Sequence, residues 1–405
     1  MDLYSGIPYW IAKNELSNEY NPLRENETFE VAVIGSGITG ALVSDALCRA
    51  GIRCCVVDKR SLSTGSSCAS TALLQYEIDV PLCRMAEMMP EADALEAYRS
   101  CLRSIGELKE ILDRAGVDAA FEQVPSIFYA SNRKGLRGIR EEYNIRTKYG
   151  LPVDYLTGKE LRKRTGIKAP GALANNVSAQ VDAYRAAQGL LARNRQQHNL
   201  TVFTHTEICD WKRTKEGYLL TSGEGKTIAC RYVVVAAGFE AAPFLPEKLM
   251  QLTTTFAIVS QPVDSADLWW KRSLIWETRE LYLYIRTDDS NRILVGGEDI
   301  NINQPEMRKF LLKKKSAVLE KKFKKLFPRI PFVTEMAWAG TFSSTKDGLP
   351  LIGALHGNPR MLYALGYGGN GITFSVIASQ ILTKAIQGET DPKAHIFSPE
   401  RESLR

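Results

Sequence analysis

Three glycines, Gly35, Gly37 and Gly40, directly follow an apolar run in the stretch VAVIGSGITG. Glycine can adopt a positive φ, and it has no Cβ to block a bound group. Where a helix begins, free backbone N–H groups and a partial positive charge favour an anion such as phosphate. Asp58 follows about 20 positions later, a spacing typical of a carboxylate that binds a ribose hydroxyl. The spacing predicts dinucleotide binding; the alternative is a tight turn in an ordinary strand–helix–strand unit.

A second glycine-rich loop, LGYGGNGITFS, holds Gly366, Gly368, Gly369 and Gly371. It also leads into a helical pattern, so its backbone N–H groups can stabilise negative charge. The two loops lie more than 300 residues apart, and together they could bind the two ends of one long cofactor. The first loop would bind the pyrophosphate, and the second would face the charge that develops on a reduced isoalloxazine ring. The alternative for the second loop is a glycine cap and turn.

The chain around these loops alternates between strand and helix patterns. Residues 30–35 predict a buried strand, 38–51 have helical spacing, and 52–60 predict the next strand. Helical patterns recur at 91–116 and 133–149, the stretch 252–300 is rich in strands, and the last part returns to strand, loop and helix. This order favours two interleaved domains over two consecutive ones.

The composition is that of an ordinary globular enzyme, since 44% of the 405 residues are hydrophobic and 24% are charged. No apolar run reaches the roughly 18 residues that span a bilayer, and the first residues do not resemble a signal peptide. The eight cysteines form no C-x-x-C pair and the four histidines are scattered, so we expect reduced thiols and no metal site. The net charge of +6 does not imply nucleic acid. We therefore expect a cytoplasmic protein without a transmembrane segment.

One basic stretch contains seven lysines between Lys313 and Lys325. Leu311, Leu319 and Phe323 are among the apolar residues that fall near one helical face there. An amphipathic surface helix with a solvated basic face explains the pattern. The alternative is a docking surface for an acidic partner or an anionic membrane. The oligomeric state stays open.

Five stretches of the chain carry a family resemblance. They are VAVIGSGITGALVSDAL with VVDKR, STGSSCASTALLQ, RYVVVAAGF, WAGTFSSTKDGLPLIG and LYALGYGGNGITFS. In this order they resemble the D-amino-acid oxidase superfamily of FAD-dependent amine oxidoreductases, which includes glycine oxidase, sarcosine oxidase and γ-glutamylputrescine oxidase. The resemblance implies an α/β fold with an α+β substrate domain: a doubly wound FAD-binding sheet interleaved with a mixed, largely antiparallel substrate-binding domain. The FAD-binding segments are expected at 29–110, 166–248 and 337–405, and the substrate segments at 111–165 and 249–336.

The resemblance also implies which residues bind FAD. The first three glycines would approach the pyrophosphate, Asp58 would bind the adenosine ribose, and Ile208 would meet adenine through its backbone. Ser66, Ser67 and Thr71 would lie along the cofactor near its phosphates and flavin, and the loop 369–373 would face the flavin carbonyl end. The full set expected at the cofactor is Gly35, Ser36, Gly37, Ile38, Thr39, Gly40, Asp58, Lys59, Ser66, Ser67, Thr71, Ala72, Leu73, Ile208, Ala237, Gly238, Gly340, Gly368, Gly369, Asn370, Gly371, Ile372 and Thr373.

The chemistry that the resemblance implies is removal of a hydride equivalent from a carbon that bears nitrogen. The hydride passes to flavin N5 and leaves an imine, which water hydrolyses. The protein would orient the C–H bond and stabilise charge on the reduced ring. No strong acid–base side chain is needed if the amine binds in its neutral form, which is consistent with the few histidines.

The sequence departs from the family where relatives bind a substrate carboxylate. The region where glycine and D-amino-acid oxidases carry an arginine holds Thr341, Phe342 and Ser343 here. Leu74 and Thr373 stand where sarcosine oxidases carry cations. A desolvated carboxylate needs a charged partner. We therefore expect a substrate without an α-carboxylate, unless Arg286 or another cation reaches the pocket.

Two further departures concern the cofactor. Gly340 replaces the cysteine that tethers FAD in sarcosine oxidases, so we expect non-covalent FAD. Leu294 replaces a lysine that the same branch uses for oxygen activation, so the electron acceptor is open between oxygen and another molecule.

The candidates for the substrate pocket are Tyr282, Tyr284, Phe342 and Glu77. A strand would send both tyrosines to one face; the alternative is that they are packed core tyrosines. Glu77 could bind a distal ammonium group, as a polyamine-like substrate would need; the alternative is a surface carboxylate.

Three functions are consistent with these residues. The first is an FAD-dependent oxidase or dehydrogenase that acts on a small amine without an adjacent carboxylate. The second is an enzyme similar to glycine, D-amino-acid or sarcosine oxidase with a relocated carboxylate clamp. The third is a flavoprotein subunit of an electron-transfer complex, with the basic helix as its docking surface.

Overall fold

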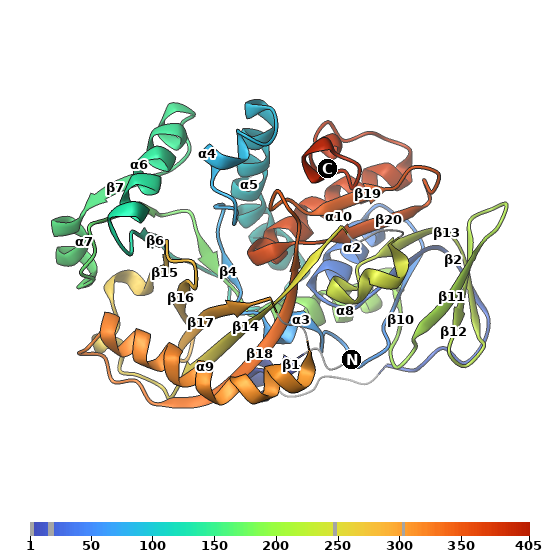
Figure 1. The fold of residues 1–405 in the computed structure, drawn as a ribbon. Coiled ribbons are helices and arrows are strands. Elements are labelled where there is room, and N and C mark those ends of the chain that lie inside the picture. Colours follow the sequence, from blue (N-terminus) through green and yellow to red (C-terminus); the bar gives the residue numbers. More distant parts are fainter. Residues whose placement is uncertain (1–3, 15–19, 246–248, 302–303) are drawn as a thin grey trace.

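The computed structural model describes residues 4–14, 20–245, 249–301 and 304–405. Two large β-sheets organise these residues, and helices pack against both (Figure 1). This is the mixed α/β architecture that the sequence predicts.

An eight-stranded sheet contains the strand before the first glycine loop. Its spatial order is β10 (Thr201–Phe203), β3 (Cys54–Val57), β2 (Glu27–Ile34), β13 (Thr227–Val235), β12 (Tyr218–Ser222) and β11 (Ile208–Arg213), while β20 (Met361–Leu365) pairs with β13 and with β19 (Leu351–Ala354). The strand pairs β10–β3, β3–β2, β2–β13 and β13–β20 are parallel. Val31 and Val33 enter the core under the helices, whereas Ala32 and Ile34 enter the core of the opposite face. The run is apolar throughout because the strand is buried on both faces.

Four helices pack together on one face of this sheet. They are α2 (Ile38–Arg49), α5 (Glu91–Ala115), α8 (Ala183–His198) and α10 (Gly371–Gln387). α5 ends at Gly116, whose φ of 64° is the left-handed geometry that stops a helix. α2 follows the first glycine loop, and α10 follows the second, which forms the short helix η4 (Gly368–Asn370). The two loops therefore begin helices of the same layer.

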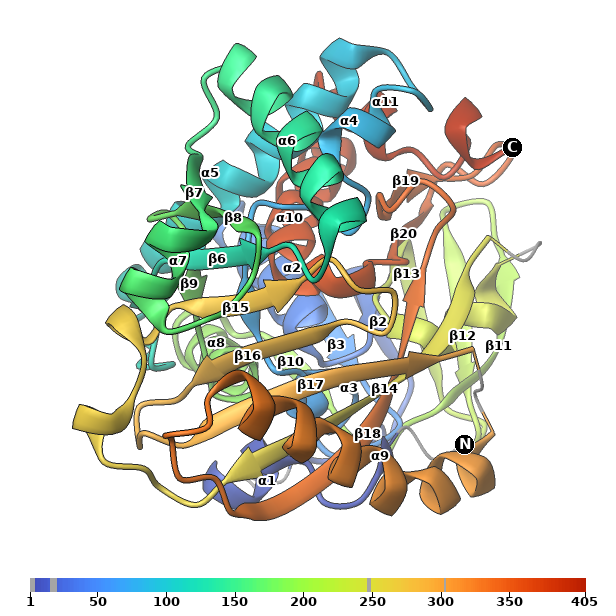
Figure 2. The same cartoon turned by 60° about the vertical axis from the view of Figure 1, so that its left-hand side comes forward.

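A nine-stranded sheet forms the other large layer (Figure 2). Its spatial order is β1 (Tyr4–Ser5), β18 (Thr334–Ser344), β14 (Gln251–Ser260), β17 (Ile293–Ile300), β16 (Leu283–Thr287), β15 (Leu274–Glu277), β6 (Ser126–Tyr129), β8 (Gly171–Asn175) and β7 (Asp154–Thr157). Neighbouring strands are antiparallel except β15 and β6. This agrees with the mixed, largely antiparallel sheet expected for a substrate-binding layer.

The lysine-rich stretch forms α9 (Pro305–Leu326), which packs across β14, β17 and β18. Leu319 and Phe323 of α9 are fully buried in the core that Ile285 and Val295 also enter. The predicted amphipathic helix is therefore present, with its apolar face on the sheet. α6 (Arg133–Lys148) and α7 (Gly158–Thr165) pack near β7 and β8 at the far end.

The remaining elements are short. They are the small sheet of β4 (Leu73–Leu74), β9 (Ala179–Gln180) and β5 (Glu122–Gln123), the helices α1 (Tyr9–Asn14), α3 (Ser66–Ala69), α4 (Leu82–Met85) and α11 (Ala394–Phe397), and the 3-10 helices η1 (Gly238–Phe244), η2 (Ser265–Asp267), η3 (Trp270–Arg272) and η5 (Glu402–Leu404). None of the described helices combines the length and the apolar character needed to cross a membrane.

Each large sheet collects strands from separated parts of the chain. The eight-stranded sheet takes strands from 27–57, 201–235 and 351–365, and the nine-stranded sheet takes most of its strands from 126–175, 251–300 and 334–344. The two layers are interleaved in sequence. The division at the five expected segment boundaries stays a prediction.

Candidate cofactor and substrate site

A cavity of about 650 Å³ is lined by residues of both large sheets and by both glycine loops. Helices α2 and α10 pack against each other, and the hydroxyls of Thr39 and Ser375 in their first turns share a hydrogen bond of 2.8 Å. The two anion-favouring helix ends predicted from sequence therefore lie together at one cavity. This arrangement suits one long ligand that contacts both ends.

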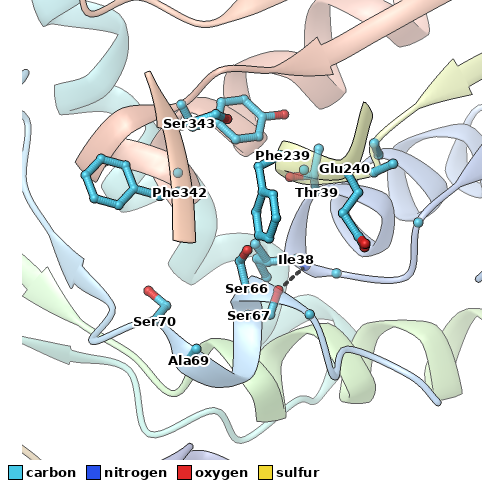
Figure 3. A pocket seen from close by; sticks show the side chains of 18 of the residues that line it. Ile38, Thr39, Ser66, Ser67, Ala69, Ser70, Phe239, Glu240, Phe342 and Ser343 are labelled. Atoms are coloured by element: carbon cyan, nitrogen blue, oxygen red, sulfur yellow. Dashed lines mark hydrogen bonds between the residues drawn. The ribbon is translucent and has the colours of Figure 1, made fainter. Parts of the chain in front are cut away.

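The first glycine loop needs glycine for two different reasons. Gly35 has a φ of +113°, which L-residues rarely adopt, and a Cβ on Gly40 would collide with the carbonyl oxygen of Gly35. The Ile38 N–H donates to Ser67 Oγ at 2.9 Å, so a residue of α3 touches the N-terminus of α2 (Figure 3). Together these contacts form a cradle of small groups at a helix N-terminus, which can bind phosphate.

Asp58, at the end of β3, faces the same loop. Its Oδ2 accepts the backbone N–H of Ser36 at 2.8 Å and the Ser36 hydroxyl at 2.7 Å, and its Oδ1 accepts the Arg60 N–H at 2.9 Å. Asp58 lines the cavity. The carboxylate therefore fixes the glycine loop and also stands where a ribose hydroxyl could reach it.

A cluster beyond Asp58 closes this end of the cavity, and the sequence did not reveal it. Glu240 of η1 accepts both Nη atoms of Arg60, at 2.7 and 3.0 Å, and pairs with Lys59 Nζ at 3.0 Å. Trp211 and Phe244 stack nearby with ring centroids 4.4 Å apart. Lys59 and Ile208 were expected here; their partners come from distant parts of the chain, which no local pattern identifies.

The second glycine loop is tied to the segment that follows β4. The Gly369 N–H donates to Asp79 Oδ2 at 2.7 Å, and Asn370 Nδ2 donates to the carbonyl oxygens of Gln75 and Glu77 at 3.1 and 2.9 Å. A Cβ on Gly368 would collide with the Asp79 carboxylate. The sequence reasoning missed Gln75 and Asp79, although they share a period of two with Glu77 and all three line the cavity.

Arg286 does not line the cavity. Its Nη1 donates to the carbonyl oxygens of Thr71, Ala72 and Val181 at 3.0, 2.9 and 2.8 Å. Burial lowers the pKa of its guanidinium to about 10. Ala72 has a φ of +53°, so Arg286 holds a strained turn of the expected cofactor segment rather than supplying a free cation to the pocket.

Aromatic side chains of the nine-stranded sheet line the end of the cavity away from Asp58. Tyr282 and Tyr284 lie with ring centroids 5.6 Å apart, and the Tyr284 hydroxyl is 3.1 Å from that of Thr255. Trp276 is the register partner of Tyr284 and also lines the cavity. Burial raises the pKa of both tyrosines above the ordinary range. Phe342, on β18, also lines the cavity (Figure 3).

Glu77 is a buried carboxylate with an ion-pair partner. Its Oε1 accepts Arg146 Nη1 at 3.1 Å and Asn175 Nδ2 at 2.8 Å, while Oε2 has no hydrogen-bond partner among the described residues. Burial raises the pKa of Glu77, and Arg146 opposes that shift. Arg146 also pairs with Glu142 at 2.7 Å, so two carboxylates share one guanidinium and leave a negative charge.

The cavity brings together nearly all the residues expected at the site. The four substrate-pocket candidates line it, and so do the cofactor candidates except Ser36, Gly40 and Thr373. Each of those three contacts a residue that does line the cavity. The Ser36 hydroxyl donates to Asp58, Gly40 lies against the carbonyl oxygen of Gly35, and Thr373 Oγ1 donates to the Asn370 carbonyl oxygen at 2.9 Å. These placements leave the individual roles as predictions.

Comparisons with known proteins agree with this geometry. γ-Glutamylputrescine oxidoreductase of Escherichia coli is 25% identical over 93% of this chain and 88% of its own length. Glycine oxidase of Geobacillus kaustophilus is 22% identical over 89% of this chain and 93% of its own. The crystal structure of glycine oxidase from that organism superimposes with a TM-score of 0.77, at 20% identity, over 93% of this chain and all of that one.

The model of one protein family, described as FAD dependent oxidoreductase, matches residues 30–385. This range includes both glycine loops, Asp58 and the aromatic wall. The chain belongs to this family, the FAD-dependent oxidoreductases of the DAO type.

Proposed function

We propose that this protein oxidises a carbon–nitrogen bond of a small amine that lacks an α-carboxylate, with FAD held non-covalently. The observation that carries the proposal is the charge at the aromatic end of the cavity. Glu77 and Asp79 line this end, and the described lining residues include no lysine or arginine there. Lys59 and Arg60 line the other end, where both pair with Glu240.

The residues of the cavity fit FAD. The glycine cradle at α2 and the hydroxyl of Ser67 suit a pyrophosphate, and Asp58 suits a ribose. The loop that opens α10 lines the same cavity, beside the N-terminus of α2, and the first N–H groups of α10 lack intrahelical acceptors. When bound there, the flavin would accept a hydride equivalent at N5 from the carbon next to nitrogen, and water would hydrolyse the resulting imine.

The chain's own residues would orient and desolvate the amine. Tyr282, Tyr284 and Phe342 supply apolar and aromatic surface around the reacting carbon. An anionic wall stabilises a cationic substrate as it enters the cavity. The amine must then lose a proton before it can be oxidised, and no described histidine lines the cavity to accept it.

An α-amino acid fits this wall poorly. Its carboxylate would lose hydration worth several kcal/mol and would face carboxylates instead of a guanidinium. Arg286, the cation nearest in sequence to the two tyrosines, is already bound to three carbonyl oxygens. The alternative, an amino-acid oxidase with a relocated clamp, would need a cation that the described lining residues do not supply at this end.

The relatives support an amine-type substrate in coarse terms. One acts on γ-glutamylputrescine and another on glycine, as their names state. The decisive experiment mixes the oxidised holoenzyme anaerobically with matched pairs of amines and amino acids, for example butylamine with 2-aminopentanoic acid. Bleaching of the flavin by amines would support the proposal. Rapid bleaching by glycine, sarcosine or a D-amino acid, with no response to any amine, would favour the relocated clamp.

One surface favours a second candidate, an electron-transfer subunit. Lys313, Lys314 and Lys321 of α9 are exposed, and Phe310 on the same helix is 79% exposed. Leu294 stands where sarcosine oxidases carry the oxygen-activating lysine, so the electron acceptor could be a molecule other than oxygen. Size-exclusion chromatography of the native protein tests this candidate. An acidic partner that co-elutes, and that dissociates when these lysines are replaced by glutamine, would support it.

A further inference from the structure

We propose that the aromatic end of the cavity contains a second cation site, formed by Asp79, Asp299 and the two pocket tyrosines, and that the substrate is an α,ω-diamine. One amino group would lie at the reacting position, and the distal ammonium group would lie between the two aspartates. This inference rests on the proposed function, because it names the class of amine.

A β-bulge in β17 turns Asp299 toward Thr255 and Tyr282, two residues that line the cavity. Gly296 lies under the Tyr284 ring on the cavity face, so simple alternation would place Glu298 on that face too. Instead Gly297 and Glu298 have φ values of +135° and +60°, and the pairing with β14 shifts register there. Glu298 pairs with Lys315 of α9 at 2.8 Å, on the opposite face. A bulge that re-aims a side chain is typical of functional sites.

Asp299 then lies against groups that line the cavity. The hydroxyls of Thr255 and Tyr282 lie near its side chain and lower its pKa, while its Oδ1 has no partner among the described residues. Burial raises the pKa of Asp299 to about 6, and Asp79 adds to the shift by charge repulsion.

Asp79 itself lines the cavity. Its one hydrogen bond in the described structure comes from the Gly369 N–H. Gln75, Glu77 and Asp79 alternate along the chain, and all three line the cavity. Neither Asp79 nor Asp299 forms an ion pair with any described lysine or arginine within 4.0 Å. Two neighbouring carboxylates without an ion-pair partner favour a bound cation.

A third observation points independently to a ligand. Glu77 is only 6% exposed, yet its Oε2 has no partner, and it lines the same cavity. No group of three or more described histidine, cysteine or acidic residues is arranged to hold a metal ion. Tyr282, Tyr284 and Trp276 surround the site with aromatic rings, which bind organic ammonium groups through cation–π contact. The chemistry of the wall matches an alkylammonium group.

The test compares α,ω-diaminoalkanes of three to eight carbons with the matching n-alkylamines. The dissociation constants are measured by calorimetry on the holoenzyme whose flavin has been fully reduced, because that form cannot oxidise the ligand. The wild-type protein should bind its best diamine about tenfold or more tightly than the matched monoamine, since a charged hydrogen bond contributes that much. Equal affinities would overturn the inference.

The variants Asp79→Asn and Asp299→Asn assign the site to its residues. Asparagine keeps an oxygen for the Gly369 N–H or the neighbouring hydroxyls but removes the charge. Each variant should lower the diamine-to-monoamine preference about tenfold, whereas Asp154→Asn, which removes an exposed charge on β7, should leave it unchanged. A preference that survives both aspartate substitutions would overturn the assignment. If one variant does not fold, the other and the wild-type comparison still decide.

Flavin bleaching and binding affinity, measured with the same ligands, test the proposed function and the second cation site separately. Flavin bleaching by monoamines and diamines alike, with equal affinities, would leave the function standing and remove the second cation site. Tight, aspartate-dependent diamine binding without any bleaching would leave a cation site but would overturn both the proposed oxidation and the diamine's role as substrate.

Discussion

The hydroxyl of Thr39 lies 2.8 Å from the hydroxyl of Ser375, which joins the first turn of α2 to the first turn of α10. These residues are 336 positions apart in the chain. Ser375 also donates to the carbonyl oxygen of Gly371 at 2.6 Å, so the contact reaches the second glycine loop directly. This contact therefore holds the N-terminal ends of the two packed helices beside each other.

Purified protein should be yellow, and acid precipitation should release its FAD into the supernatant. Gly340 lines the cavity and offers no thiol to the cofactor, and a Cβ there would meet only the side chain of Ala69, at 3.5 Å. The absorbance spectrum of the supernatant measures the release. Flavin fluorescence that stays with the denatured chain on a gel would contradict non-covalent binding.

Asp58→Ala should weaken FAD binding by about 1.5–3 kcal/mol, or roughly tenfold or more in affinity. The alanine removes the expected ribose contact and also frees the Ser36 N–H and hydroxyl that the carboxylate binds. Titration of the apoprotein with FAD, followed by flavin fluorescence, gives the dissociation constant. Asp58→Asn keeps one oxygen for the loop, so its affinity for FAD should lie between those of the wild-type protein and Asp58→Ala. Wild-type affinity in a folded Asp58→Ala protein would exclude Asp58 as a cofactor ligand.

Phe342→Arg should shift preference toward glycine-like substrates. In the wild-type protein an unpaired carboxylate should lower kcat/KM by about two or more powers of ten, because each 1.36 kcal/mol of lost stabilisation is tenfold. A guanidinium at this cavity position would restore the missing partner. The ratio of kcat/KM for glycine to that for ethylamine is the measurement, and Phe342→Met, which removes the ring without adding charge, is the control. An unchanged ratio in Phe342→Arg would show that this position does not face the substrate.

Diamine binding should weaken as the pH falls through about 6, the value to which burial raises the pKa of Asp299. The diamine stays doubly protonated below pH 8, since alkylamines have pKa values near 10. A cation prefers the ionised carboxylate, so its affinity is highest well above pH 6. At pH 5 only about a tenth of the carboxylate is ionised, which predicts about tenfold weaker binding than at pH 8.

The groups around Asp299 define what else contributes to this pH dependence. The Thr255 and Tyr282 hydroxyls lower its pKa, while Asp79 and Glu298 raise it. Desolvation also raises the pKa of Asp79, so both aspartates gain protons at higher pH than usual. Calorimetry with 1,4-diaminobutane on the reduced holoenzyme from pH 5 to 8 gives the profile. Asp299→Asn should flatten it, and an equally steep profile in that variant would assign the titration elsewhere.

The sequence by itself determined the parts of the site that depend on spacing along the chain. The glycines at 35, 37 and 40 and the acidic residue at 58 mark one helix end, because a strand, a tight turn and a helix must follow one another within a few residues. The absence of an arginine at 341–343 is also visible directly, since it concerns residue type alone. Together with the family resemblance of the five stretches, these features predicted the fold class, FAD and the kind of substrate to test.

Only the tertiary structure decided which side chains meet. Glu77 is a plausible free carboxylate in sequence, yet Arg146, 69 positions away, is paired with it in the folded protein. Arg286 looks available as a clamp, but packing brings three carbonyl oxygens to its guanidinium. Asp299 is the clearest case. Alternation along β17 predicts that Glu298 lies on the cavity face of the strand, but a bulge places Glu298 on the opposite face and Asp299 on the cavity face. Strand register and packing are set by long-range contacts, so a period read along the chain cannot determine them.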